Sequence, residues 1–215
     1  MNHTLLYIIA GYLSGSILSA RICSSFMKKD ILIYSNDNNP GAANAFTYGG
    51  FFCGIITLFG DILKGFLPVY CYLLNAGGMS FNLTLVLAAP VIGHILPVFY
   101  HFKGGKGIAA SSGVVISLML FPKYCFMFTV FGILTFALVA KISRYVSLAS
   151  LIGMAMFFVE FLIWGFLGWL PLTGTSLVEG TVIVFALAAL AFIRHRSNIV
   201  RLVHGTERKI GQKKN

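Results

Sequence analysis

Long apolar stretches, separated by short polar connections, run through the whole chain. They cover approximately Leu5–Phe26, Phe51–Leu74, Leu83–Phe99, Ile108–Leu120, Tyr124–Ala140, Val146–Leu167 and Leu177–Ile193. A helix that crosses a bilayer needs roughly 20 mostly apolar residues. In lipid, a helix satisfies its backbone hydrogen bonds within the segment. The pattern therefore predicts an all-α integral membrane protein with about seven transmembrane helices.

The fourth stretch, Ile108–Leu120, is short for a full span. It contains Gly113, and Pro122 follows shortly after its end. A tilted span, a partly re-entrant segment and a segment fused to the fifth stretch all agree with this length.

Basic residues in alternate connections predict the orientation, because Lys and Arg concentrate on the cytoplasmic side. The second, fourth and sixth connections hold Lys123 alone. We therefore expect the N-terminus outside and the C-terminus in the cytoplasm. Residues 1–197 are predicted to form a single polytopic membrane domain, and residues 198–215 a basic cytoplasmic tail. The other connections and the tail hold Lys28, Lys29, Lys103, Lys106, Lys141, Arg144, Arg194, Arg196, Arg201, Arg208, Lys209, Lys213 and Lys214.

Composition supports a membrane protein. The chain is 58% hydrophobic and 10% charged, with a mean hydropathy of +0.87, which is too apolar for one water-soluble core. The net charge of +10 is compatible with nucleic-acid binding. The cations, however, lie in small clusters between apolar stretches, so we expect membrane lipid as a partner and no nucleic acid.

The cysteines show no metal-binding spacing. Cys23, Cys53, Cys71 and Cys125 are scattered through apolar stretches without a C-x-x-C motif or a nearby histidine pair. We interpret them as buried apolar side chains and predict neither a metal nor a cofactor.

Asp61 and Lys64 lie three residues apart within the second apolar stretch. They therefore share one helix face and can form an ion pair. Ionisable residues inside a membrane are often functional. A neutralised pair that fixes helix packing is an equally good interpretation.

Two polar connections contain candidate site residues. The connection Lys28–Gly50 is rich in Asn, Pro and Gly, and includes Gly41 and Asn44; an ordinary polar loop has the same composition. The connection Gly93–Gly107 contains Lys103, Gly104, Gly105, Lys106 and Gly107, directly before an apolar helix. Glycine amides, a helix start and two lysines predict a phosphate site. The alternative is that the lysines contact lipid headgroups.

Three further segments lie on the same predicted face. His94 is a candidate base, a donor to an anion or a packing residue. Arg144 lies just before the sixth stretch and Ser147 near its start. His195 lies just before the predicted tail, and Asn198 is its first residue. Topology and helix capping account for each segment alone, but their convergence on one face favours a shared cytoplasmic site.

At these motifs the sequence resembles the bacterial acyl-phosphate-dependent glycerol-3-phosphate acyltransferase family, over nearly its whole length. The similar segments are Gly11–Ile17, Pro40–Asn44, Asp61–Gly65, Gly93–Pro97, Phe102–Gly107, Arg144–Ser150 and Arg194–Ile199. The resemblance implies a seven-span enzyme of the bacterial plasma membrane with its active site on the cytoplasmic side. Its substrates would be acyl phosphate and sn-glycerol 3-phosphate, and its product would be lysophosphatidate for phospholipid synthesis.

The resemblance also implies residue roles. His94, Asn44, Ser147 and His195 are expected to act in catalysis by orienting the hydroxyl or the oxyanion. Lys103, Gly104, Gly105, Lys106, Gly107 and Arg144 are expected to bind phosphate, with Asp61, Lys64, Gly41 and Asn198 in support.

The chain departs from the family pattern in its first loop. The family usually has an acidic-aliphatic-arginine run, a Gly-Ser-Gly-Asn turn and an arginine shortly after the conserved asparagine. Here these positions read Asp30-Ile31-Leu32, Asn36-Asp37-Asn38-Asn39 and Thr47.

Asp37 thereby brings a negative charge close to the expected phosphate. Either Arg21 or Lys64 compensates for it, or the chain is a divergent paralogue with an altered substrate or rate. Two other functions are alternatives: a non-catalytic carrier or scaffold for lipid or phosphorylated metabolites, and an acyltransferase that uses acyl-CoA or acyl carrier protein with a different acceptor.

Overall fold

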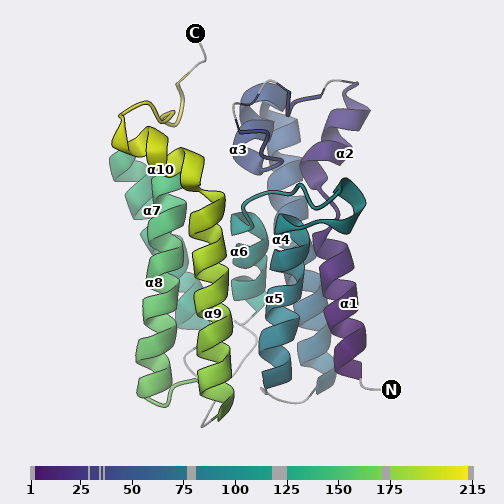
Figure 1. The fold of residues 1–215 in the computed structure, drawn as a ribbon, viewed down its shortest axis with the longest axis vertical. Coiled ribbons are helices and arrows are strands. Elements are labelled where there is room, and N and C mark those ends of the chain that lie inside the picture. Colours follow the sequence, from purple (N-terminus) through teal and green to yellow (C-terminus); the bar gives the residue numbers. More distant parts are fainter. Residues whose placement is uncertain are drawn as a thin grey trace. The chain divides into compact units, whose positions relative to one another are not determined.

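A computed structural model describes residues 3–28, 30–33, 35, 37–76, 81–117, 125–170 and 175–212. All regular structure in these ranges is helical, as the sequence predicts. The chain divides into two compact units (Figure 1). The first comprises Met1–Gly78 and Asn82–Ser117, and the second comprises Met79–Phe81 and Leu118–Asn215.

The first unit contains long apolar helices and several short helical segments that connect them. They are α1 (His3–Gly15), α2 (Ser19–Phe26), α3 (Ala42–Asn44), the π-helical η1 (Ala45–Gly49), α4 (Gly50–Ala76), α5 (Phe81–Ile95), the 3-10 turn η2 (Val98–Tyr100) and α6 (Ile108–Ser117).

The first predicted span is broken into two helices. α1 and α2 meet at an angle of 41°. A side chain on Gly15 would collide with the Pro90 carbonyl oxygen, which lies 2.2 Å from the ideal Cβ position. The Ile17 carbonyl accepts a hydrogen bond from Lys64 Nζ at 2.7 Å. The break therefore frees a backbone acceptor for a buried cation.

Small residues allow α4 and α6 to pack closely. An added Cβ on Gly65 would lie 2.1 Å from the Ala110 carbonyl oxygen, and one on Gly113 would lie 2.0 Å from that of Ile62. Small residues at such contacts are typical of helix pairs in membranes, because they let the backbones approach. The described part of the short fourth stretch, α6, is thus packed along α4.

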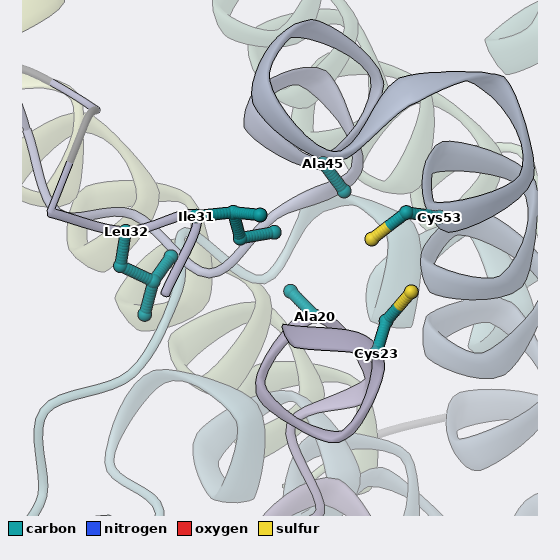
Figure 2. Close-up of a cluster of buried hydrophobic side chains, with 6 residues drawn as sticks. All are labelled: Ala20, Cys23, Ile31, Leu32, Ala45 and Cys53. Carbon is teal, nitrogen blue, oxygen red and sulfur yellow. The ribbon is translucent and has the colours of Figure 1, made fainter. Parts of the chain in front are cut away.

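A buried apolar cluster holds the first loop against α2 and α4. Figure 2 shows Ala20 and Cys23 of α2, Ile31 and Leu32 of the loop, Ala45 of η1 and Cys53 of α4. Cys23 and Cys53 are buried free thiols, whereas Cys71 is exposed, contrary to the expectation that it is buried. The side chain of Cys125 lies outside the described residues. The packing anchors the polar loop that follows Leu32.

The second unit contains α7 (Cys125–Ser143), α8 (Val146–Phe166), α9 (Thr175–Arg194) and the short α10 (Arg196–Val203). α8 contacts both α7 and α9 along its length, and α10 packs against α8 and α9 (Figure 1). The predicted boundary between membrane domain and tail, at residues 197–198, falls within α10. The beginning of the tail is therefore helical.

The apolar helices match the predicted stretches in position. Four segments are long and apolar enough to cross a membrane, and the bent pair α1–α2 makes a fifth. The four segments without a bend are Ala42–Asn75, Leu83–Tyr100, Val146–Phe166 and Leu177–Arg194. Two shorter apolar helices cover Ile108–Ser117 and Thr129–Ser143. The described part of the chain thus contains four or five spans by length and composition.

Candidate functional site

Asp61 and Lys64 form the predicted ion pair in the first unit. Lys64 Nζ lies 2.8 Å from Asp61 Oδ1, and the two side chains are 6% and 1% exposed. Ser19 Oγ donates to the same carboxylate oxygen at 3.0 Å. His94 Nδ1 lies 3.9 Å from it. The pair therefore joins α4 to the α1–α2 break and lies beside a predicted catalytic histidine.

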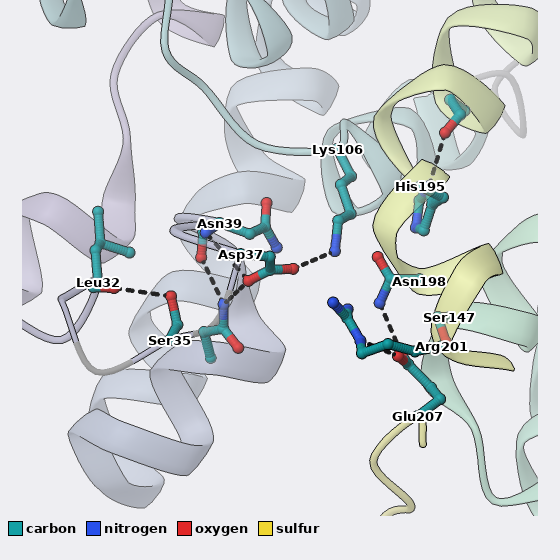
Figure 3. Close-up of polar contacts among 12 residues, drawn as sticks. Leu32, Ser35, Asp37, Asn39, Lys106, Ser147, His195, Asn198, Arg201 and Glu207 are labelled. Atoms are coloured by element: carbon teal, nitrogen blue, oxygen red, sulfur yellow. Dashed lines mark hydrogen bonds and ion pairs between the residues drawn. The ribbon is translucent and has the colours of Figure 1, made fainter. Parts of the chain in front are cut away.

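A second carboxylate organises the first polar loop. Asp37 Oδ1 accepts hydrogen bonds from Asn44 Nδ2 at 2.9 Å and from the Asn39 N–H at 3.3 Å. Asp37 Oδ2 pairs with Lys106 Nζ at 2.7 Å (Figure 3). The expected compensation by Arg21 or Lys64 is wrong: Lys106 neutralises Asp37, Lys64 is held by Asp61, and the Arg21 guanidinium lies over the Tyr100 ring at 5.4 Å.

The charge of Asp37 is stabilised by these contacts. Burial alone would raise the pKa of the carboxyl group, but the Lys106 charge and the hydrogen bonds from Lys106, Asn44 and Asn39 outweigh it and hold the pKa below its ordinary value. Asn44 in turn uses both Nδ2 protons, since it also donates to the Asn39 carbonyl at 3.0 Å. Gly41 precedes α3, and its carbonyl accepts from the Ala45 N–H at 3.1 Å.

The glycine-rich connection packs directly on His94. The Gly105 N–H donates to the His94 carbonyl at 3.0 Å. A Cβ added to Gly105 would lie 2.1 Å from His94 Nε2. One added to Gly104 would lie 2.1 Å from the His94 carbonyl oxygen. These glycines therefore permit close approach to a buried histidine. The Gly105 amide is engaged within the protein.

The remaining residues of this connection lead into α6. Gly107 has a φ of +86°, which favours glycine, and its carbonyl accepts from the Ser111 N–H at 2.8 Å at the start of α6. Lys103 is exposed, whereas Lys106 is half-buried. The two predicted phosphate-binding lysines thus lie in different environments.

Glu207 organises a polar cluster in the second unit. Its Oε1 accepts from Ser147 Oγ at 2.6 Å and from Asn198 Nδ2 at 2.7 Å, and its Oε2 accepts from Arg201 Nε at 2.7 Å (Figure 3). Although burial alone would raise the pKa of Glu207, these hydrogen bonds and the Arg201 charge hold it below its ordinary value. The cluster ties the start of α8 to α10 and the segment after it.

This arrangement fixes which atoms of Ser147 and Asn198 can accept a hydrogen bond. A carboxylate only accepts, so Ser147 gives its proton to Glu207 and keeps oxygen lone pairs available. The Asn198 amide nitrogen also points to Glu207. Its buried Oδ1 has no hydrogen-bond partner among the described residues. In both side chains an oxygen acceptor is therefore left over by the contacts with Glu207.

His195 and Arg144 are held by backbone groups of the same unit. His195 is 2% exposed, and its Nδ1 lies 2.8 Å from the Ala191 carbonyl (Figure 3). The carbonyl only accepts, so Nδ1 carries the proton and Nε2 is the acceptor of the neutral ring. Arg144 donates to the Ile210 carbonyl at 2.9 Å, and the Ile210 N–H donates to the Arg144 carbonyl at 2.8 Å.

The structure thus places the predicted residues in a few local clusters. Asn44 and Lys106 meet through Asp37, His94 lies near Asp61, and Ser147 and Asn198 meet through Glu207. Glu207 was not predicted to be part of the site, and Lys106 was not predicted to be the partner of Asp37. Within the described ranges, no three His, Cys, Asp or Glu residues are placed to hold a metal ion.

Long apolar helices with buried ion pairs and clusters of polar side chains define a multi-pass membrane protein. The model of the family described as glycerol-3-phosphate acyltransferase matches residues 5–205. The chain belongs to this family.

Curated relatives are similar to this chain over nearly its whole length and theirs. The glycerol-3-phosphate acyltransferase of Endomicrobium trichonymphae is 38% identical, covering 96% of this chain and 95% of the relative. That of Shewanella sp. (strain ANA-3) is 35% identical, covering 98% and 95%.

Crystal structures of PlsY (YgiH), an integral membrane glycerol 3-phosphate acyltransferase, are also similar. Its glycerol 3-phosphate form has a TM-score of 0.84 and its lysophosphatidic acid form 0.81, each at 32% identity, covering 98% of this chain and 96% of that chain.

Proposed function

We propose that this protein transfers a fatty acyl group from acyl phosphate to the 1-hydroxyl of sn-glycerol 3-phosphate, giving lysophosphatidate and inorganic phosphate. The similarity to glycerol-3-phosphate acyltransferases carries this proposal, because the family match over residues 5–205 includes Asn44, Lys106 and Ser147. The solved relative with glycerol 3-phosphate in its name supports the acceptor.

The reaction needs positioning and charge neutralisation more than a covalent nucleophile. Acyl phosphate is a mixed anhydride with phosphate as a good leaving group. The acceptor hydroxyl oxygen forms a bond to the acyl carbon, the bond from that carbon to the phosphate oxygen breaks, and phosphate leaves. A phosphate oxygen of a substrate can accept the hydroxyl proton.

The clusters suggest a division of roles. In the first unit, Lys106, Asn44 and the start of α6 after Gly107 are proposed to bind phosphate. His94, held between Asp61 and the glycine loop, is proposed to donate to an anion. In the second unit, Ser147 and Asn198 present acceptors, which suits them to orient a hydroxyl. Lys103 and Arg144 are proposed to add charge and hydrogen bonds for phosphate and for the oxyanion. The Nε2 acceptor of His195 is proposed to help orient the hydroxyl.

We propose seven spans with the N-terminus outside and the C-terminus in the cytoplasm of a bacterial plasma membrane. The alternation of basic connections supports this orientation. The polar clusters would then lie on the cytoplasmic side. Residues 1–197 would form the membrane domain and residues 198–215 the tail.

The choice of donor tests the proposal. Purified protein in lipid should acylate glycerol 3-phosphate with palmitoyl phosphate and ignore palmitoyl-CoA. Transfer from palmitoyl-CoA or from acyl carrier protein would replace the donor in the proposal. A protein that binds glycerol 3-phosphate without forming lipid would be a carrier.

The two lysines of the glycine-rich connection provide a test of the phosphate site. Lys106→Ala should abolish transfer while the protein still inserts into the membrane. Lys103→Ala is the matched control, because Lys103 is exposed in the same connection, and it should keep more activity. Full activity of Lys106→Ala would refute the assigned phosphate site.

A further inference from the structure

In the first unit, Asp37 is surrounded by donors of the kinds that bind anions. Its carboxylate is held by an ammonium, a side-chain amide and a backbone N–H, from Lys106, Asn44 and Asn39. Such a combination of donors is typical of protein sites for phosphate and carboxylate groups. Lys106 and Asn44 are also residues for which the family resemblance implies substrate contacts.

These contacts use groups that a substrate phosphate would need. The 2.7 Å contact with Asp37 neutralises the Lys106 ammonium, and both side chains are 14% exposed. One of the two Asn44 N–H groups is spent on the same carboxylate. A phosphate therefore meets a pair with no net charge, in which the Asp37 carboxylate offsets the attraction of the Lys106 ammonium.

We propose that Asp37 is a specificity-determining residue that competes internally with the substrate phosphate for Lys106 and Asn44. The inference rests on the proposed function, in which Lys106 binds a substrate phosphate. The inference goes beyond that function because it states that Asp37 of the first loop determines how tightly the site binds anions. The low pKa of Asp37 keeps the competitor charged throughout the physiological pH range.

The opposite role for Asp37 is to position Lys106 for the substrate. Both roles fit a short ion pair, but they predict opposite effects of removing the charge. If Asp37 competes, a neutral residue releases Lys106 and tightens binding of phosphate. If Asp37 positions Lys106, the same change loosens the lysine and weakens binding.

Asp37→Asn separates these roles because asparagine has the same shape. Its Oδ1 can still accept from the Asn39 N–H and from Asn44 Nδ2, which preserves the turn. Its amide group cannot pair with an ammonium. Asp37→Ser is a second variant with a smaller neutral side chain. The matched control is Asp30→Asn, because Asp30 is an exposed carboxylate of the same loop whose Oδ1 accepts from the Leu32 N–H at 3.0 Å.

The experiment measures binding of inorganic phosphate and of glycerol 3-phosphate to the full-length protein in detergent, by isothermal titration calorimetry. Asp37→Asn should bind both anions roughly three- to tenfold more tightly than the wild type, and Asp37→Ser should change in the same direction. Asp30→Asn should stay within about twofold. In the transfer assay, KM for glycerol 3-phosphate should fall in parallel.

Unchanged or weaker binding of phosphate by both Asp37 variants would overturn the proposal. Since phosphate binding needs no turnover, this comparison also stands if the wild type fails to acylate glycerol 3-phosphate. That failure would reject the proposed reaction, whereas the binding comparison decides the role of Asp37.

Discussion

The buried pair of Asp61 and Lys64 predicts strong energetic coupling between the two residues. Asp61→Asn leaves the Lys64 ammonium buried without its counter-charge, and Lys64→Met leaves the Asp61 carboxylate in the same condition. Removing one partner of a buried ion pair costs about 3–5 kcal/mol. For a chain of this length, 1 kcal/mol corresponds to about 2–4 °C in melting temperature. Each single variant should therefore melt roughly 6–20 °C below the wild type.

The double variant should melt above both single variants. With both charges gone, the amide side chain introduced by Asp61→Asn can still accept from Ser19, whose hydroxyl lies 3.0 Å from the present carboxylate. The remaining loss is the hydrogen bond from Lys64 to the Ile17 carbonyl, which has a length of 2.7 Å. An unsatisfied buried carbonyl costs about 1–3 kcal/mol, less than an unpaired buried charge.

The assay is thermal unfolding of the four proteins in one detergent, at one scan rate, because unfolding of such proteins can be irreversible. A double variant that melts below both single variants would refute the reasoning, since the two losses would then add as for independent residues. A transfer assay on the double variant would separate packing from chemistry. Transfer near the wild-type rate would assign the pair to packing.

Two further predictions concern the glycine loop and the tail. Gly105→Ala should reduce transfer more than about tenfold, because its Cβ would lie 2.1 Å from His94 Nε2. Gly153→Ala is the control, since nothing lies within 4 Å of an added Cβ there, and it should keep full activity. For Glu207, the folded-state pKa is lowered, so its stabilising contribution is present above the unfolded value and is lost as pH falls through the folded pKa. Hydrogen exchange of residues 196–212, corrected for intrinsic rates, should therefore accelerate in acid in the wild type. In Glu207→Gln the exchange rate should no longer depend on pH in this way. Equal pH profiles for the two proteins would contradict this prediction.

The sequence predicts the helices well because hydrophobic length is a local property. α8 begins at Val146 as expected, and its end at Phe166 lies one residue from the predicted end. α5 ends at Ile95, before the predicted end at Phe99, where Pro97 precedes a 3-10 turn. The bend after Gly15 was not predicted, and the close approach of Gly15 to Pro90 of α5 is a contact between helices that a local hydrophobic pattern does not reveal.

Site residues could be chosen from the sequence, but most of their partners could not. The pair of Asp61 and Lys64 was predictable, since residues three apart on a helix share a face. Lys106 and Asp37 are 69 positions apart, and Ser147 and Glu207 are 60 apart. Only the folded chain brings such residues together. The sequence did place the Asp37 carboxylate close to the expected phosphate site. From this proximity Arg21 or Lys64 was chosen as its partner, whereas the partner is Lys106.

The most direct measurement is transfer of labelled palmitoyl from palmitoyl phosphate to glycerol 3-phosphate by the purified protein reconstituted in lipid. The account predicts labelled lysophosphatidate, dependent on both substrates and absent with Lys106→Ala. Folded protein that forms no lysophosphatidate, beside an active acyltransferase measured in the same assay, would contradict the proposed reaction.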